Sequence, residues 1–342
     1  MSASEAIHVD GEIERRTTLT RAEFVLEFER RRPVVVRGAS QRALAWTPAR
    51  LQELAGGAEL VLLDGVYDED ARAAGFAHAR ELRTPLRDYV RGLLDGSAAG
   101  YLFNTESGVL LTHPESPEFR AGWGRAVNPG LAPLARELDL PGFLRTDNVV
   151  YATLILGGPA QQSPLHYDLG GEAKALVQLA GRKRVHLFAP SEAGRLAFPS
   201  WFEESPAPFR VPHASDASLD RPDPVRFPRL GEAHALTTVL EPGDVLYWPS
   251  FWAHHLRNLE PFTLAVSVTL EELWTTPMHL RESLGHLALL FRRMAGDPRH
   301  AFDLSSQAGV QAALKALEAE LFSARNRERT TMWSWHCSLF HE

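Results

Sequence analysis

The amino-acid sequence predicts a mainly β protein with α-helical additions, built around an antiparallel barrel or sandwich. Three observations support this fold class. Short apolar runs separated by Gly and Pro clusters fill residues 149–268, and this pattern is typical of antiparallel strands. The residues before 145 mix helical and strand patterns. After residue 275 the hydrophobic period changes from two to about 3.6, which predicts a pair of C-terminal helices.

The N-terminal part, residues 1–145, is predicted to be mixed α/β. A helix is expected over residues 20–32, because Thr20 is a favourable cap and Pro33 cannot continue a helix. Further helices are expected over residues 47–55 and 84–94, and strands over 34–36 and 60–63.

The β core, residues 146–275, is predicted to hold strands over residues 149–156, 173–181, 183–190, 236–240, 245–248 and 262–268. A Pro-rich insert over residues 191–235 interrupts them, and a connection of this length is often functional. Residues 249–255 are expected to turn into the next strand. The helical region, 276–342, carries two apolar stripes: Leu284, Leu287, Phe291 and Met294, then Val310, Leu314, Leu317 and Leu321.

Composition excludes several classes of function. The 342 residues carry a net charge of −7, which argues against holding nucleic acid by general electrostatics. The single cysteine, Cys337, permits neither an intrachain disulfide nor a cysteine cluster around zinc or iron–sulfur. No signal peptide or stretch of 18 apolar residues is present, so we expect a cytoplasmic protein without membrane association.

The segment HYD at residues 166–168 is the strongest candidate for chemistry. In an extended chain His166 and Asp168 point to one side and Tyr167 to the other. His254, which follows the strand over residues 245–248, is the best third ligand. Two histidines and one carboxylate form the facial triad typical of non-haem iron(II) oxygenases. The alternative from the residues alone is that each histidine is a hydrogen-bonded core residue.

Three ordered motifs make this sequence similar to a known family. HYD at 166–168, GRKR at 181–184 and EPGDVLYWPSFWAHHL at 241–256 resemble the cupin-type JmjC hydroxylases, in particular the asparaginyl hydroxylases that act on hypoxia-inducible factor and their bacterial cupin-like relatives. RRPVVVRG at 31–38, YLFNT at 101–105 and ELDLPGFL at 137–144 also resemble segments of this family. The resemblance covers residues 14–275 and implies a double-stranded β-helix, or jelly roll, of the cupin type.

The resemblance also implies roles for particular residues. His166, Asp168 and His254 take the places of the family's catalytic iron(II) ligands, and His255 is then structural. Lys183 matches the lysine that binds the distal carboxylate of the cosubstrate 2-oxoglutarate; an isolated lysine would otherwise be a solvated surface residue. Hydroxyl groups from the positions of Ser163 and Tyr101 bind the same carboxylate in relatives.

The activity implied is that of an Fe(II)- and 2-oxoglutarate-dependent dioxygenase, which hydroxylates a C–H bond of a protein or peptide side chain and releases succinate and CO2. One alternative is a hydroxylase of a small molecule or peptide natural product. Another is a non-catalytic cupin-like binding module. Demethylation of lysine is a further reaction that the same iron centre can catalyse. The C-terminal helices resemble those that form homodimers in relatives.

The sequence also departs from the family. Gly170 and Gly171 lie in a connection about two residues longer than in the hydroxylase, while Lys174 and Ser267 each replace an asparagine near the cosubstrate, so substrate identity does not transfer. Two other clusters of potential ligands occur in the sequence. For His336, Cys337 and His341 we expect simple packing. Asp216, Asp220 and Asp223 fit a solvated loop better than a substrate clamp.

Overall fold

The computed structural model describes residues 7–64, 80–103, 105–112, 127–144, 149–159, 161–168, 172–198, 215, 217–219, 222–270 and 312. The predicted C-terminal helices, the cluster around Cys337, the Gly170–Gly171 connection, Asp216 and Asp220 lie outside the described residues, as does much of the Pro-rich insert. Within the described residues, no helix is both long and apolar enough to span a membrane.

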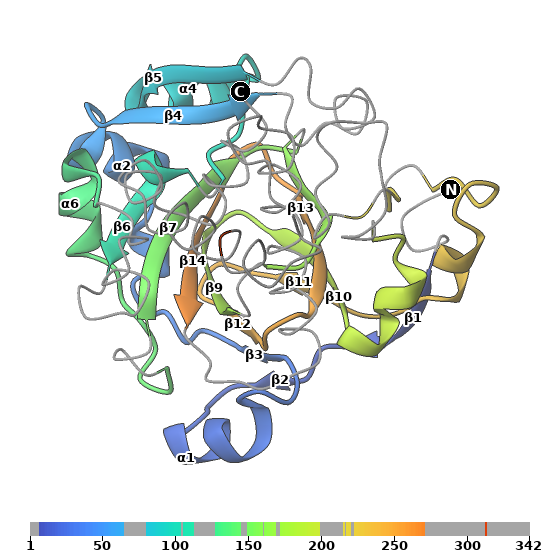
Figure 1. Cartoon of the computed structure of the whole chain (residues 1–342). Coiled ribbons are helices and arrows are strands. Elements are labelled where there is room, and N and C mark those ends of the chain that lie inside the picture. The colour runs from blue at the N-terminus through green and yellow to red at the C-terminus, as the bar shows by residue number, and fades with distance from the viewer. Residues whose placement is uncertain are drawn as a thin grey trace.

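Eight strands form the core as two facing sheets (Figure 1). They are β7 (Val149–Gly157), β8 (Gln162–His166), β9 (Ala173–Ala180), β10 (Lys183–Phe188), β11 (His234–Leu240), β12 (Val245–Trp248), β13 (Ala253–Asn258) and β14 (Thr263–Leu270). One sheet has the order β1-β11-β10-β13-β8 and the other β2-β3-β12-β9-β14-β7-β6; among the described residues neither closes into a barrel. The chain crosses repeatedly between the sheets, which confirms the predicted cupin-type jelly roll.

The remaining elements extend the sheets or cover them. The strands are β1 (His8–Glu12), β2 (Arg15–Arg16), β3 (Val34–Val36), β4 (Glu59–Asp64), β5 (Arg80–Pro85) and β6 (Val109–Thr112). The helices are α1 (Arg21–Glu23), continued by a π-helical turn over Phe24–Phe28, α2 (Pro48–Ala55), α4 (Leu86–Asp95) and α6 (Ala132–Ala135). Figure 1 shows α2, α4, α6 and the β4–β5 hairpin outside the edge of the core that carries β7.

The first helix is shorter than the sequence predicted. Thr20 caps it as expected, because its hydroxyl accepts from the Glu23 amide and the Glu23 side chain accepts from the Thr20 amide. The helical segment nevertheless ends at Phe28, not at residue 32. Arg30 has a φ of 61° and donates its amide N–H to the Tyr247 hydroxyl at 2.9 Å. This left-handed turn stops the helix before Pro33 is reached.

Apolar residues pack in three layers. The middle layer lies between the two sheets and includes Val185, Leu187, Leu246 and Leu256. A second layer covers the outer face of the larger sheet with α2, α4 and α6. A third covers the smaller sheet with residues of the 188–235 region. Side chains that share a face with the middle layer therefore point into the space between the sheets.

The turn between β9 and β10 supplies a stability prediction. Gly181 has a φ of 63°, and a Cβ there would collide with the Phe262 carbonyl and lie 2.9 Å from the Thr263 hydroxyl. We expect Gly181→Ala to lower the free energy of unfolding by about 1–3 kcal/mol. Gly194→Ala, where a Cβ meets nothing within 4 Å, should change it by less than about 0.5 kcal/mol. Urea denaturation measures both, and equal midpoints would contradict the prediction.

Candidate metal centre

Strand pairing brings the three predicted ligands together. His166, the last residue of β8, lies opposite His254 on β13, and their ring centroids are 4.1 Å apart. Asp168 follows β8, and its Oδ2 lies 3.7 Å from His254 Nε2. One ligand atom from each of these three residues lies within 4.8 Å of the other two. Among the described residues this is the only cluster of three that could hold a metal ion.

The hydrogen bonds of the two histidines fix which nitrogen faces the centre. His166 Nδ1 lies 2.7 Å from the Pro164 carbonyl, and His254 Nδ1 lies 3.0 Å from the Trp252 carbonyl. A carbonyl only accepts, so in the neutral rings each Nδ1 carries the proton and each Nε2 keeps its lone pair. Asp168 Oδ2 is buried and has no hydrogen-bond partner among the described residues. This donor set fits a divalent metal ion.

A β-bulge in β8 places Ser163 and His166 on the same face. The register between β8 and β13 shifts there, so that Leu256 pairs with Ser163 while His254 pairs with His166. Two residues on β8, Pro164 and Leu165, thus lie opposite one on β13, His255. In a regular strand, residues three apart would face opposite sides. Because of the bulge, the hydroxyl and the imidazole both point between the sheets.

Local electrostatics favour the ionised carboxylate and the neutral histidine. Burial alone would raise the pKa of Asp168, but the charges of Lys174 and the two histidines and a hydrogen bond from Trp248 hold that pKa below its usual value. Burial lowers the pKa of His254, although Asp168 opposes this effect. A carboxylate and a neutral imidazole are the protonation states that bind metal ions.

A second group of polar residues lies deeper between the sheets, around Lys183. Its side chain is 1% exposed and shares a face with Val185 and Leu187. Its ammonium donates to Asn258 Oδ1 at 2.7 Å, and no carboxylate is recorded beside it within the described part of the chain. Burial lowers the pKa of Lys183 to about 7. A buried ammonium with only a neutral partner is suited to an anionic ligand.

Asn258 ties this deeper group together. Its amide N–H groups donate to the carbonyls of Gly158 and Gln161 at 3.1 and 3.0 Å, which leaves Oδ1 directed at Lys183. The Tyr101 phenol hydrogen-bonds to Asn258, and burial raises the pKa of Tyr101. The Tyr101 ring packs so closely on Gly157 that a Cβ there would lie 2.8 Å from it. Tyr101 is therefore held beside the Lys183–Asn258 pair.

Two buried hydroxyls face the same interior space. Ser163 Oγ on β8 and Thr153 Oγ1 on β7 have no hydrogen-bond partner among the described residues. Thr153 shares a face with Ile155 of the middle layer and pairs with Ser267 on β14. Buried polar atoms in native proteins are normally satisfied. These two hydroxyls thus supply hydrogen-bonding capacity for a ligand between the sheets.

Aromatic rings enclose the histidines. Trp248 lies 5.0 Å from the ring of His254, and Phe103 lies 6.1 Å from that of His166 and stacks on Tyr101 at 5.3 Å. On the opposite face of the smaller sheet, His255 stacks on His186 at 6.0 Å. His255 thus points away from the centre, as the sequence predicted.

The family model of the cupin-like domain matches residues 21–269. The chain belongs to the cupin-like domain family. The resemblance seen in the sequence is confirmed at this level.

Named relatives match smaller parts of this cupin-like chain. The HSPB1-associated protein 1 homolog of Danio rerio is 34% identical over 125 residues, which are 35% of this chain and 25% of the relative. The rat HSPB1-associated protein 1 is 28% identical over 44% of this chain and 30% of its own length. The chain thus spans less than a third of these relatives.

Two comparisons extend over more of the cupin-like chain. The tRNA wybutosine-synthesizing protein 5 of Gallus gallus is 24% identical over 261 residues, or 73% of this chain and 74% of the relative. The solved structure of E. coli ycfD superposes with a TM-score of 0.38 and 17% identity, covering 91% of this chain and 70% of that one.

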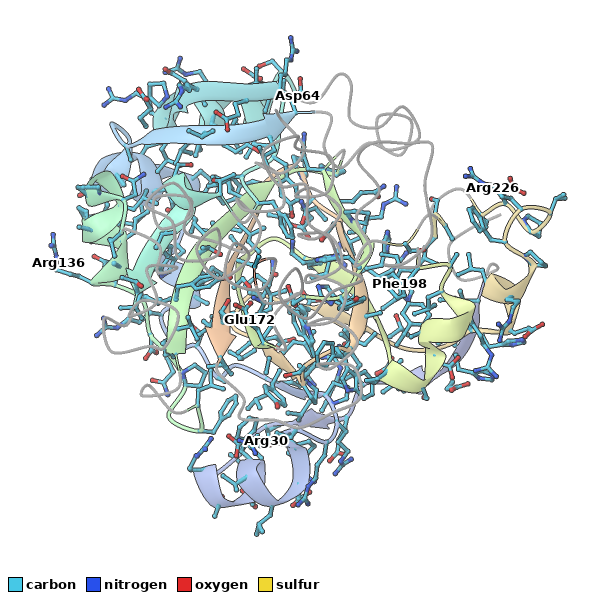
Figure 2. The ribbon with its side chains drawn as sticks, in the orientation of Figure 1. Arg30, Asp64, Arg136, Glu172, Phe198 and Arg226 are labelled. Atoms are coloured by element: carbon cyan, nitrogen blue, oxygen red, sulfur yellow. The ribbon has the colours of Figure 1, made fainter. Side chains whose placement is uncertain are left out.

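The cupin-like fold assembles more site residues than sequence reasoning named. Lys183, Ser163 and Tyr101 are buried and face the space between the sheets, and their role in binding the cosubstrate stays a prediction. Asn258 and Thr153 were missed, although strand alternation from Ile155 could have indicated Thr153. Figure 2 shows Glu172 near the middle of the view among the core strands, while Arg136 and Arg226 project from the periphery. Glu172 accepts a hydrogen bond from the buried Lys174.

Proposed function

We propose that this cupin-like protein is an Fe(II)- and 2-oxoglutarate-dependent dioxygenase that hydroxylates a C–H bond of a protein or peptide side chain. The observation that carries the proposal is the pairing of two sites in one interior. The Nε2 atoms of His166 and His254 and a carboxylate oxygen of Asp168 converge at its mouth, and a buried ammonium, with no counter-charge among the described residues, lies deeper. Together they match a metal chelated by an oxoacid whose far carboxylate needs a cation.

The reaction balances as 2-oxoglutarate, O2 and a C–H bond giving succinate, CO2 and a C–OH group. Iron(II) bound by the triad supplies the activation of dioxygen. The chain's own residues would bind and orient the ion and the oxoacid. His166, Asp168 and His254 would hold the ion, while Lys183 would bind the distal carboxylate together with the hydroxyls of Ser163 and Tyr101. The rings of Phe103 and Trp248 restrict water.

The substrate class rests on the family resemblance. A relative whose name refers to wybutosine synthesis in tRNA makes nucleic acid the competing class. A net charge of −7 favours a protein or peptide. Succinate release, measured separately with a peptide library and with unfractionated tRNA, distinguishes them. Turnover with tRNA alone would overturn the proposed substrate class but leave the proposed chemistry in place.

The proposed chemistry is tested by an anaerobic titration of metal-free protein with iron(II), followed by 2-oxoglutarate. A chelated oxoacid gives a visible metal-to-ligand charge-transfer band, so we expect a band that saturates with the oxoacid. Protein that binds iron(II) but develops no band would refute the dioxygenase proposal. A cupin-like binding module would then be the better account.

The low pKa of Lys183 predicts how oxoacid binding depends on pH. Burial lowers this pKa to about 7, so above pH 7 the free protein holds mostly neutral Lys183. Binding the distal carboxylate then requires uptake of a proton. We expect the apparent affinity for 2-oxoglutarate to fall by up to about tenfold per pH unit above 7. Titrations of the metal-loaded protein at pH 7, 8 and 9 measure this.

The control for the pH series is 2-oxobutyrate, which chelates in the same way but has no distal carboxylate. Its affinity should change much less over the same range. If both oxoacids lose affinity equally, the titrating group is not Lys183.

A further inference from the structure

Lys174 is a buried cation beside the triad. It lies on β9, between Trp248 on β12 and Thr269 on β14, and its side chain is 5% exposed. The β9 positions that point between the sheets alternate with those that face the outer layer, so Lys174 shares its face with Leu176 of the middle layer. Its ammonium therefore enters the same interior as the metal-binding atoms.

The partners of Lys174 fix its ammonium in place. Nζ donates to Glu172 Oε2 and to Thr269 Oγ1, each at 2.7 Å, and lies 5.4 Å from the centre of the Tyr151 ring. Asp168 Oδ1 lies 3.7 Å from Nζ, at ion-pair distance. An ammonium has three N–H donors, and two of them are held by short bonds. Lys174 cannot leave Asp168 without breaking both.

The two oxygens of Asp168 face different partners. Oδ1 is directed at the Lys174 ammonium, whereas Oδ2 lies 3.7 Å from His254 Nε2 and has no hydrogen-bond partner among the described residues. The Trp248 side chain adds a hydrogen bond to the same carboxyl group. One oxygen is thus available to a metal ion, and the other is turned to a cation.

Whether Asp168 binds the metal through one oxygen or through both changes the number of coordination positions left for other ligands. An octahedral ion bound by two imidazoles and one carboxylate oxygen keeps three positions open, enough for a chelating oxoacid and dioxygen. A carboxylate that binds through both oxygens occupies a fourth position. Metal-bound Asp and Glu can adopt either mode. The group that holds the second oxygen therefore decides how many positions remain.

We propose that Lys174 is a positioning residue that retains Asp168 Oδ1, so that Asp168 binds the metal through Oδ2 alone and three positions stay open. This inference rests on the proposed function, because it takes the triad as a metal site. Glu172 and Thr269 contribute to this positioning, because their hydrogen bonds hold the Lys174 ammonium in place.

The test counts water molecules on Mn(II), an ion that favours oxygen ligands and reports bound water through line broadening in 17O-enriched water. The wild-type protein should show three bound waters. Lys174→Met removes the charge, and Lys174→Gln keeps a polar group that can bond to Thr269; both should lose one water. Lys174→Arg, which retains a cation, should keep three. Arg91→Met, a change at a side chain that is 70% exposed on α4, is the matched control and should also keep three.

The outcomes separate this inference from the proposed function. Wild-type protein that binds no Mn(II) removes the metal site itself. Wild-type protein with two waters, or folded Met and Gln variants that still carry three, overturns the role of Lys174 and leaves the metal site standing. Folded variants that no longer bind Mn(II) also overturn it, because the proposal assigns Lys174 the choice of oxygen and not retention of the ion. If neither variant folds, the wild-type count decides.

Discussion

Replacing His254 with alanine should weaken iron(II) binding by more than about 100-fold and abolish the visible oxoacid band. Substituting a residue that merely supports a metal ligand costs 10–100-fold in affinity, so removing a ligand should cost at least as much. His254 is buried between β10 and β8, and its Nε2 faces Asp168 Oδ2 at 3.7 Å. No other described histidine is placed to replace it, because His255 points to the opposite face.

The matched control is His234→Ala. His234 is 47% exposed and pairs with Asp10 on the smaller sheet's edge strand. This variant should bind iron(II) like wild type. Metal affinity is measured by anaerobic titration, and thermal unfolding verifies that both variants fold. A folded His254→Ala protein that binds iron(II) with wild-type affinity would show that the triad is not the metal site.

Replacing Lys183 with methionine should weaken 2-oxoglutarate binding by about 100-fold while iron(II) affinity stays unchanged. Removing one partner of a buried charge pair costs about 2–5 kcal/mol, and about 3 kcal/mol corresponds to this factor. Methionine keeps an unbranched chain in the space that Lys183 fills. The ammonium of Lys183 lies with Asn258, and not with the triad, which is why the metal should be unaffected.

Two comparisons sharpen this experiment. Arg184→Met changes the next residue on β10, whose side chain is exposed, and should leave both affinities intact. The oxoacid 2-oxobutyrate has no distal carboxylate, so Lys183→Met should bind it almost as well as wild type does. Equal losses for the two oxoacids would mean that the variant damages the pocket in general and that Lys183 does not read the distal carboxylate.

Six of the eight core strands could be predicted from the sequence because each combines an apolar run with flanking Gly or Pro, whereas β8, with the sequence QSPLH, has no such run. β13 could not be delimited in this way either. Its residues Ala253–Asn258 read as a turn followed by polar side chains, yet they form a strand enclosed between β10 and β8. Two adjacent histidines can be buried there because one faces the metal centre and the other stacks on His186. Neither environment can be predicted from the residues that neighbour the two histidines in the sequence.

The residues of the site also divide into those that the sequence predicts and those that only strand pairing brings together. The spacing of His166 and Asp168 predicts that they share a face, and the motif around His254 supplies the third ligand. The partners of Lys174 could not be predicted, because Thr269 lies 95 positions further along the chain and meets it only through the β9–β14 register. Asn258 was missed for a similar reason: it reaches Lys183 only across the β10–β13 pairing.

The bulge in β8 changes which side of the strand the residues before it face. Ser163 and His166 lie three positions apart and nonetheless face one side, because one extra residue in β8 resets the alternation between them. Without the extra residue the two would lie two positions apart in a regular strand and would still share a face, so the same pair of side chains can reach the pocket at either of two spacings. Relatives should therefore be compared at this strand by counting residues as well as by matching them.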